Sequence, residues 1–233
     1  MIVQFFGLTA TLVITKRIVN YNLLVNLFKI RPYEFRASLT FSLIGVIGLF
    51  TLQIDIIMLS ILGDETEVGI YGVAFTVTKY SDDLRNLVAM AFFPVLVKYF
   101  NRNKSPSLII KYSLMLFFSS LVVASIISYF SSEIIITIFS EEYRKSSNVF
   151  RILIFYSCLT WTTLPFTTAA QAIGKEFLFM KILIFMGIGN VIGNYIFYIN
   201  YGMIGIAYST LIVHSVGTFA QCFFIHRAIS QNN

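Results

Sequence analysis

The sequence predicts an all-α, polytopic membrane protein, and three observations carry that prediction. Hydrophobic residues make up 57% of the 233-residue chain and charged residues 12%, whereas soluble domains hold about 45–50% and about 25%. The apolar residues gather in long continuous stretches instead of alternating with polar ones, which argues against the strands of a transmembrane β-barrel. The Lys and Arg residues fall mostly between those stretches. Together these features indicate a bundle of transmembrane helices.

Six stretches are long enough to cross the hydrocarbon core of a bilayer, which needs about 20 apolar residues. They lie near 37–61, 69–97, 107–130, 148–173, 177–200 and 203–226. A shorter apolar stretch at 1–15 lacks the basic start and the cleavage site of a signal peptide, so we interpret it as the end of a longer helix. We therefore divide the chain into a partial helix with a basic cytoplasmic linker (1–35), a six-helix bundle (36–228) and a cytoplasmic tail (229–233).

The basic residues orient the predicted bundle. The loops on one side carry twelve of them and the loops on the other side carry three, which are Arg144, Lys145 and Arg151. Because cytoplasmic loops are enriched in Lys and Arg, the richer side and the C-terminus are expected to be cytoplasmic. The same scattering argues against nucleic acid as a partner, since a nucleic-acid surface gathers its cations in one patch.

The segment 131–147 is the longest connection expected on the outer side. Its apolar centre has acidic residues at both ends, a pattern that suits a helix lying in the membrane interface. A simple extension of the preceding span fits the same residues equally well, and the sequence leaves both interpretations open.

Five ionisable residues fall inside the predicted spans: Asp55 in the stretch 37–61, and Lys79, Asp82, Asp83 and Arg85 halfway along 69–97. Each costs about 2.5–3.5 kcal/mol to insert, so such residues usually face a cavity or a partner. We favour a water-filled cavity in which the cations hold phosphate oxygens or hydroxyl groups and the carboxylates accept hydroxyl groups, a cation or a proton. The alternative is mutual neutralisation at i, i+3 and i, i+4 along one helix.

Asn190 and Asn194 are the remaining candidate cavity residues. They are one helical turn apart, and Gly189 and Gly193 on the same stretch permit close helix contact. Interhelical hydrogen bonding is the preferred explanation, with contact to a hydroxyl-bearing substrate as the alternative.

The sequence offers little else that suggests chemistry. Cys158 and Cys222 are isolated in apolar stretches, and His214 and His226 have no companion at ligand spacing. We therefore expect no disulfide, no metal and no cofactor. No phosphate-binding loop, HExxH motif or Ser/His/Asp grouping is present, so we expect a protein that is not an enzyme.

Several stretches together resemble the polysaccharide flippase branch of the multidrug/oligosaccharidyl-lipid/polysaccharide exporter superfamily. The strongest is IDIIMLSILGDETEVGIYGVAF at 54–75, followed by Pro94 near the end of the next predicted helix. IFSEEYRKSSNVFRIL at 138–153 resembles the family's Phe-x-x-Glu-Tyr turn. AAQAIGKEF at 169–177 and GNVIGNYIFYINYGMIGIAYSTLI at 189–212 are similar to its Gln-x-x-Gly-Lys loop and its Asn-x-x-x-Asn helix.

The resemblance implies a MATE-like fold of two six-helix lobes around a central cavity, of which this chain would supply the C-terminal lobe. It implies a multi-pass protein of the bacterial plasma (inner) membrane, with membrane lipid, lipid-linked oligosaccharide and an N-terminal lobe as partners. The implied activity is translocation of undecaprenyl-diphosphate-linked oligosaccharide for O-antigen, capsule or exopolysaccharide synthesis. The alternatives are a multidrug or metabolite exporter of the same superfamily and a truncated, inactive fragment. A polymerase-type membrane enzyme is disfavoured, because such enzymes need a larger outer loop.

Overall fold

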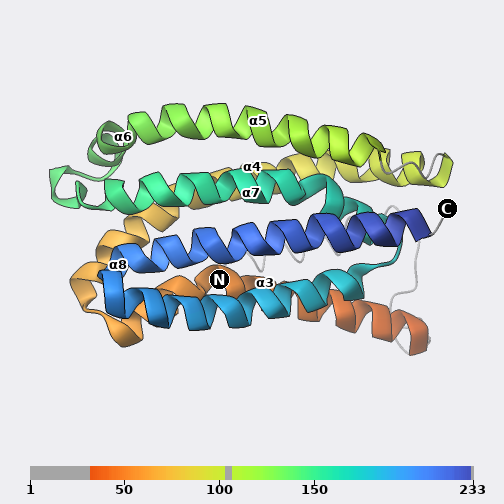
Figure 1. The fold of residues 1–233 in the computed structure, drawn as a ribbon, viewed down its shortest axis with the longest axis horizontal. Coiled ribbons are helices and arrows are strands. Elements are labelled where there is room, and N and C mark those ends of the chain that lie inside the picture. The colour runs from red at the N-terminus through yellow and green to blue at the C-terminus, as the bar shows by residue number, and fades with distance from the viewer. Residues whose placement is uncertain (1–31, 103–106, 232–233) are drawn as a thin grey trace, which may run out of the picture. The chain divides into compact units, whose positions relative to one another are not determined.

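The computed structural model describes residues 32–102 and 107–231, and these ranges are helical apart from short connections. The predictions for 1–31, which cover the opening helix and most of the basic linker, and for 232–233 lie outside the described residues. The chain divides into two compact units, 1–42 and 43–233, and the description below concerns the second. The elements shown in Figure 1 are α3 (Pro32–Leu62), α4 (Glu65–Arg102), α5 (Ser107–Tyr129), α6 (Ser131–Ile138), the 3-10 helix η1 (Glu141–Tyr143), α7 (Ser146–Ala172) and α8 (Glu176–Gln231).

The long helices coincide with the stretches predicted from the sequence, and α8 contains the last two of them. It is interrupted at Gly202, where φ is 60° and ψ is −148°. Glycine reaches such angles at little cost because it has no Cβ. Figure 1 shows α8 folded back on itself there, and we call residues 176–201 its first limb and residues 203–231 its second limb. The break gives the chain two antiparallel helices where the sequence predicts two spans.

Several helices are long and apolar enough to cross a membrane. Within the described residues they are Ser107–Tyr129, Ser146–Ala172 and Glu176–Ser230, and the pair Ser42–Thr51 and Gln53–Leu62, bent by 45°, makes a fourth if it is taken as one span. Of the six predicted membrane spans, the one at 69–97 lies in α4, which is not among the described helices that are long and apolar enough to cross a membrane. The 23 residues of α5 extend about 35 Å at 1.5 Å per residue, which exceeds the hydrocarbon thickness of about 30 Å. The bundle also exposes large apolar side chains, among them Leu87, Met90, Tyr129 and Phe219, and in a bilayer lipid would solvate them.

Helix α7 is central to the unit, because it packs against α4, α5 and α8 (Figure 1). Its buried side chains join those of the neighbouring helices in one apolar cluster, which includes Leu59, Tyr71, Phe150, Leu153 and Ile206. This core fixes the spacing between α4, α5 and the second limb of α8, and so positions the polar groups described below.

The segment 131–147 does not continue the preceding helix. Helix α5 ends at Tyr129, and α6 is a separate helix that buries Ile135. The guanidinium of Arg151 on α7 donates from Nε to the Ser131 hydroxyl over 2.6 Å, which ties α6 to α7. The extension of the span is therefore not observed, and location of α6 at a membrane interface stays a prediction.

Candidate functional site

The carboxylate of Asp55 is the centre of a buried polar cluster. The side chain is 4% exposed, and its Oδ2 atom accepts hydrogen bonds from the Tyr71 hydroxyl (2.8 Å) and the Thr210 hydroxyl (2.7 Å). Its Oδ1 atom accepts from the side-chain amides of Asn194 (2.9 Å) and Asn190 (3.2 Å). A carboxylate has about four acceptor positions, so Asp55 is fully satisfied by these four donors.

The four donors come from different parts of the fold. Asp55 lies on α3 and Tyr71 on α4, while Asn190 and Asn194 lie on the first limb of α8 and Thr210 on its second limb. The asparagines share a face of their limb because they are spaced i, i+4. One buried carboxylate thus links four helical segments, and the preferred sequence interpretation of the asparagines, interhelical hydrogen bonding, describes their contacts.

The cluster also holds two unused acceptors. The Oδ1 atoms of Asn190 and Asn194 are buried and have no hydrogen-bond partner. Carboxylate, amide and hydroxyl oxygens are the ligands that hard cations prefer, so these residues could hold such a cation if both amides turned their oxygens toward Asp55. No group of three or more His, Cys, Asp and Glu residues suited to a metal ion occurs in the described part of the chain.

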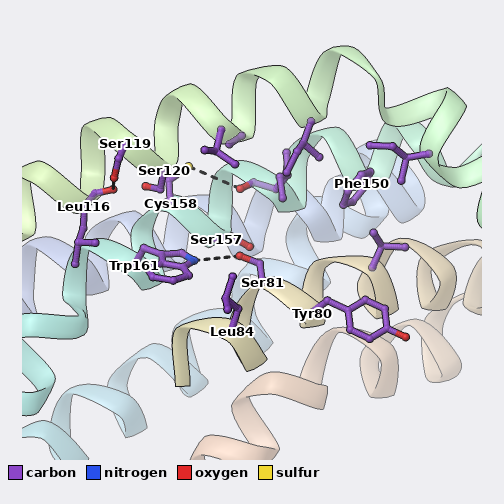
Figure 2. A pocket seen from close by; sticks show the side chains of 16 residues that line it. Tyr80, Ser81, Leu84, Leu116, Ser119, Ser120, Phe150, Ser157, Cys158 and Trp161 are labelled. Carbon is purple, nitrogen blue, oxygen red and sulfur yellow. Dashed lines mark hydrogen bonds between the residues drawn. The ribbon is translucent and has the colours of Figure 1, made fainter. Parts of the chain in front are cut away.

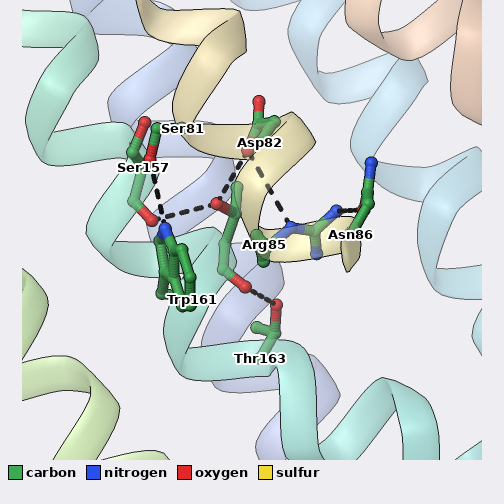
Figure 3. A network of polar contacts seen from close by, with 8 residues as sticks. Ser81, Asp82, Arg85, Asn86, Ser157, Trp161 and Thr163 are labelled. Carbon is green, nitrogen blue, oxygen red and sulfur yellow. Dashed lines mark hydrogen bonds and ion pairs between the residues drawn. The ribbon is translucent and has the colours of Figure 1, made fainter. Parts of the chain in front are cut away.

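A second polar cluster lies on α4 and faces α7 (Figure 3). Asp82 Oδ1 accepts a hydrogen bond from the Thr160 hydroxyl (3.0 Å) and lies 3.9 Å from Arg85 Nε. The other side of the guanidinium donates from Nη2 to Asn86 Oδ1 (2.9 Å). One turn before Arg85 on α4, the Ser81 hydroxyl accepts a hydrogen bond from the Trp161 indole (3.1 Å). These bonds hold Asp82 and Trp161 in place, whereas Arg85 Nε is buried without a hydrogen bond.

The charges of α4 do not neutralise one another completely. Asp82 and Arg85 form the expected i, i+3 pair. Lys79 forms no ion pair with Asp82 or Asp83 among the residues that the structure describes. Lys79 and Asp83 are both exposed on the surface of the unit, and they lie near the middle of α4. The charges of Lys79 and Asp83 are therefore available to a ligand or a partner that contacts this part of the helix.

A small cavity connects the two polar clusters. Its volume is about 20 Å³, and its lining includes Asp55, Lys79, Asp82, Tyr156 and His214. A polar cavity of about 10–15 Å³ already holds one water molecule, so this one has room for a single bridging water. It brings together Asp55 and the Lys79–Asp82 turn of α4, two regions that the sequence could only place on separate helices. Arg85 and Asp83 are not part of its lining.

Sequence reasoning missed several of these partners. Tyr71 and Thr210 donate to the carboxylate of Asp55, and Thr160 donates to that of Asp82. His214 packs its ring edge-to-face against Tyr156 with centroids 4.5 Å apart. The one available signal was the i, i+4 spacing of Thr210 and His214 within the predicted span 203–226. Hydroxyls are common in membrane helices, so their presence alone selects no site.

Comparison of the chain with protein-family models, with curated proteins and with solved structures returned no match.

Proposed function

We propose that this chain forms one lobe of a multi-pass transporter of the bacterial plasma membrane that translocates undecaprenyl-diphosphate-linked oligosaccharides for surface polysaccharide synthesis. The order of motifs along 54–212 supports the proposal, and so does the all-helical fold with several helices able to span a membrane. The distribution of Lys and Arg supports a cytoplasmic C-terminus.

The observation that carries the proposal is the exposed polar stripe of α4, formed by Lys79, Asp83 and Asn86. The three residues are spaced i, i+4 and i+7, so they share one helix face, and all are exposed. In lipid each of the two charges would cost about 2.5–3.5 kcal/mol. The stripe is therefore better explained if it faces a water-filled pathway between this lobe and a second one than if it faces acyl chains.

The two polar clusters would then have different tasks. Asp55 has no free acceptor position, so it serves to hold α3, α4 and α8 together as the lobe moves in an alternating-access cycle. Lys79 and Arg85 retain unused donors at or near the stripe, and they would contact the anionic diphosphate. Arg85 suits that role because a guanidinium presents several donors in a planar fork.

The test is replacement of these cations in cells that make the polysaccharide, with the gene in its natural context. We expect Lys79→Ala and Arg85→Ala to abolish surface polysaccharide while the protein remains inserted and abundant. Lys98→Ala is the matched control, because Lys98 is an exposed lysine nearer the end of the same helix. It should leave the polysaccharide unchanged.

Two outcomes would contradict the proposal. Normal polysaccharide from both variants would show that these cations do not contact the substrate. Normal polysaccharide after deletion of the gene, with loss of efflux of small cationic compounds, would favour the alternative of a drug or metabolite exporter.

A further inference from the structure

The small cavity between the two polar clusters has a lining residue that also lies on the surface. Lys79 lines the cavity together with Asp55 and Asp82, and it is at the same time an exposed member of the polar stripe of α4. The charged members of the lining are these two carboxylates and this one ammonium. Because the carboxylates outnumber the cation, a positive charge inside the cavity is stabilised.

The carboxylate of Asp82 has room for another donor, whereas that of Asp55 is fully satisfied. Asp82 Oδ1 accepts from the Thr160 hydroxyl (3.0 Å) and lies 3.9 Å from Arg85 Nε. Among the described residues its Oδ2 atom accepts no hydrogen bond, and Figure 3 shows that oxygen without a contact. The side chain is only 13% exposed, so a bulky ligand has little access to it. A further donor therefore has to come through the cavity.

Lys79 is the donor that is placed to do so. Lys79 and Asp82 are spaced i, i+3 on α4, and side chains at that spacing are neighbours on a helix surface. The cavity volume of about 20 Å³ admits one group of the size of a water molecule, and a lysine ammonium is a compact charge of similar size. In the described conformation Lys79 makes no ion pair with another described residue. No such pair therefore holds its ammonium on the surface.

The turn of α4 that carries Lys79 is fixed by α7, so the lysine side chain alone would have to move. Ser81 accepts from the Trp161 indole (3.1 Å) at the edge of the large apolar groove between α4, α5 and α7, as Figure 2 shows. Thr160 holds Asp82 in the same way. A lysine has a flexible four-carbon stem, so its ammonium can change place while the carboxylate stays where it is.

We infer that Lys79 alternates between two positions, one on the polar stripe in contact with the anionic substrate and one inside the cavity paired with Asp82. Asp82 is then a positioning residue, because it competes with the diphosphate of the substrate for the same ammonium and so promotes release. The inference rests on the proposed function. It gives a reason why a lobe that binds an anion keeps a carboxylate one turn from its cation.

The first experiment measures how available the Lys79 amine is in the full chain in lipid nanodiscs. Lysines are labelled briefly with an N-hydroxysuccinimide ester, and mass spectrometry gives the labelling of Lys79 relative to Lys98, an exposed lysine of the same helix. We expect Asp82→Asn to raise this ratio several-fold, because the amide no longer retains the ammonium in the cavity. Asp83→Asn is the matched control. It removes the same charge from an adjacent, exposed position that does not line the cavity, and it should change the ratio much less.

A second variant tests the cavity without any change of charge. Thr78 lines the cavity and its hydroxyl bonds to its own helix, so Thr78→Leu fills the space with carbon and should also raise the labelling ratio of Lys79. Thr76→Leu is its control, since Thr76 makes the same kind of bond within α4 but is exposed and is not part of the lining. Thr78→Leu decides the question if Asp82→Asn does not fold.

Competition with the substrate is measured with inorganic pyrophosphate, by equilibrium dialysis of the radiolabelled anion against the same nanodiscs. Asp82→Asn should tighten its binding roughly tenfold, the effect expected for one charge-assisted contact, and Asp83→Asn should not match that gain. The gain should vanish when Lys79→Met is combined with Asp82→Asn. A gain that persists there would belong to Arg85, released from its pair with Asp82, and would overturn the inference.

Two labelling results would overturn it as well. One is a ratio that neither Asp82→Asn nor Thr78→Leu raises, and the other is an equal rise in Asp82→Asn and Asp83→Asn. Either result together with loss of polysaccharide in Lys79→Ala would remove the exchange and leave the proposed function standing. Labelling that depends on Asp82, together with normal polysaccharide in both Lys79→Ala and Arg85→Ala, would keep the exchange and remove the proposed substrate.

Discussion

Replacement of Asp55 by alanine should destabilise the helix bundle strongly. The substitution removes the acceptor of four hydrogen bonds. The hydroxyls of Tyr71 and Thr210 can rotate, but the amides of Asn190 and Asn194 are fully buried and lose the carboxylate oxygen to which both of them donate. Each buried donor left unsatisfied costs about 1–3 kcal/mol. The two amides alone therefore predict a loss of about 2–6 kcal/mol in the free energy of unfolding.

The assay is unfolding of the purified protein in mixed micelles by increasing mole fractions of a denaturing detergent, followed by circular dichroism. Asp83→Ala is the control, because Asp83 is exposed and has no hydrogen bond or ion pair among the described residues. That variant should unfold at nearly the same detergent fraction as the unmodified protein. If Asp55→Ala also unfolded there, the four bonds would not stabilise the fold and the structural role assigned to this carboxylate would be refuted.

A double-mutant cycle separates the hydrogen bond from the effect of the cavity that alanine leaves. Thr210→Val preserves the shape of the side chain and removes one of the donors to Asp55. Thr210→Val should lower the free energy of unfolding of the unmodified protein, and it should change that of the Asp55→Ala variant very little. Residues in direct contact give coupling energies of about 0.5–3 kcal/mol, and additive effects would show that the two side chains do not interact.

Two further predictions concern the turn of α8 and the connection 131–147. A Cβ on Gly205 would meet the carbonyl group of Phe197, which lies on the other limb of α8. Gly205→Ala should therefore lower the free energy of unfolding by about 1–3 kcal/mol in the same assay. Gly69→Ala is the control, because a Cβ there would have nothing within 4 Å, and it should be neutral or slightly stabilising. The hydrogen bonds from Arg144 hold the pKa of Glu141 below its ordinary value of 4.5, so this pair contributes stability at neutral pH that is lost as the pH falls below that value. Arg144→Ala should raise the pKa of Glu141 toward 4.5 in an NMR titration of carbon-13-labelled glutamate, and Arg151→Ala, whose side chain bonds to serines instead, should leave it unchanged.

The helices were predictable because the apolar stretches are long and their interruptions are distinct. The boundary near residue 64 is an example: Asp64 Oδ1 accepts from the backbone N–H of Glu67 (2.8 Å) and caps α4, as expected of an acidic turn that precedes an apolar stretch. The reversal within α8 was also predictable, because Gly202 follows the polar residue Asn200. The separate helix α6 could not be told from an extension of α5, since an apolar run between acidic residues suits either conformation.

The partners of the polar residues could not be predicted for a different reason. Periodicity tells which residues share a helix face, and it predicted the pairing of Asp82 with Arg85. It does not tell which faces of distant helices meet, so the contact of Asp55 with Asn194, 139 positions away, has no local signal. That contact depends on how α3 and α8 pack within the bundle, which the summed apolar surfaces of all the helices decide.

The structure divides the candidate residues into two classes that the sequence had to treat as one. Asp55 and Asp82 both accept hydrogen bonds from neighbouring helices, and a carboxylate committed in this way has little capacity left for a sugar. Lys79 and Asp83 are exposed on the same helix, and neither forms an ion pair with another described residue. A transporter needs both kinds of group, because its lobe must stay rigid while its pathway binds and releases cargo. In the proposed transporter lobe, the charges that no described neighbour satisfies, and not the most deeply buried ones, are therefore the residues that would act on a substrate.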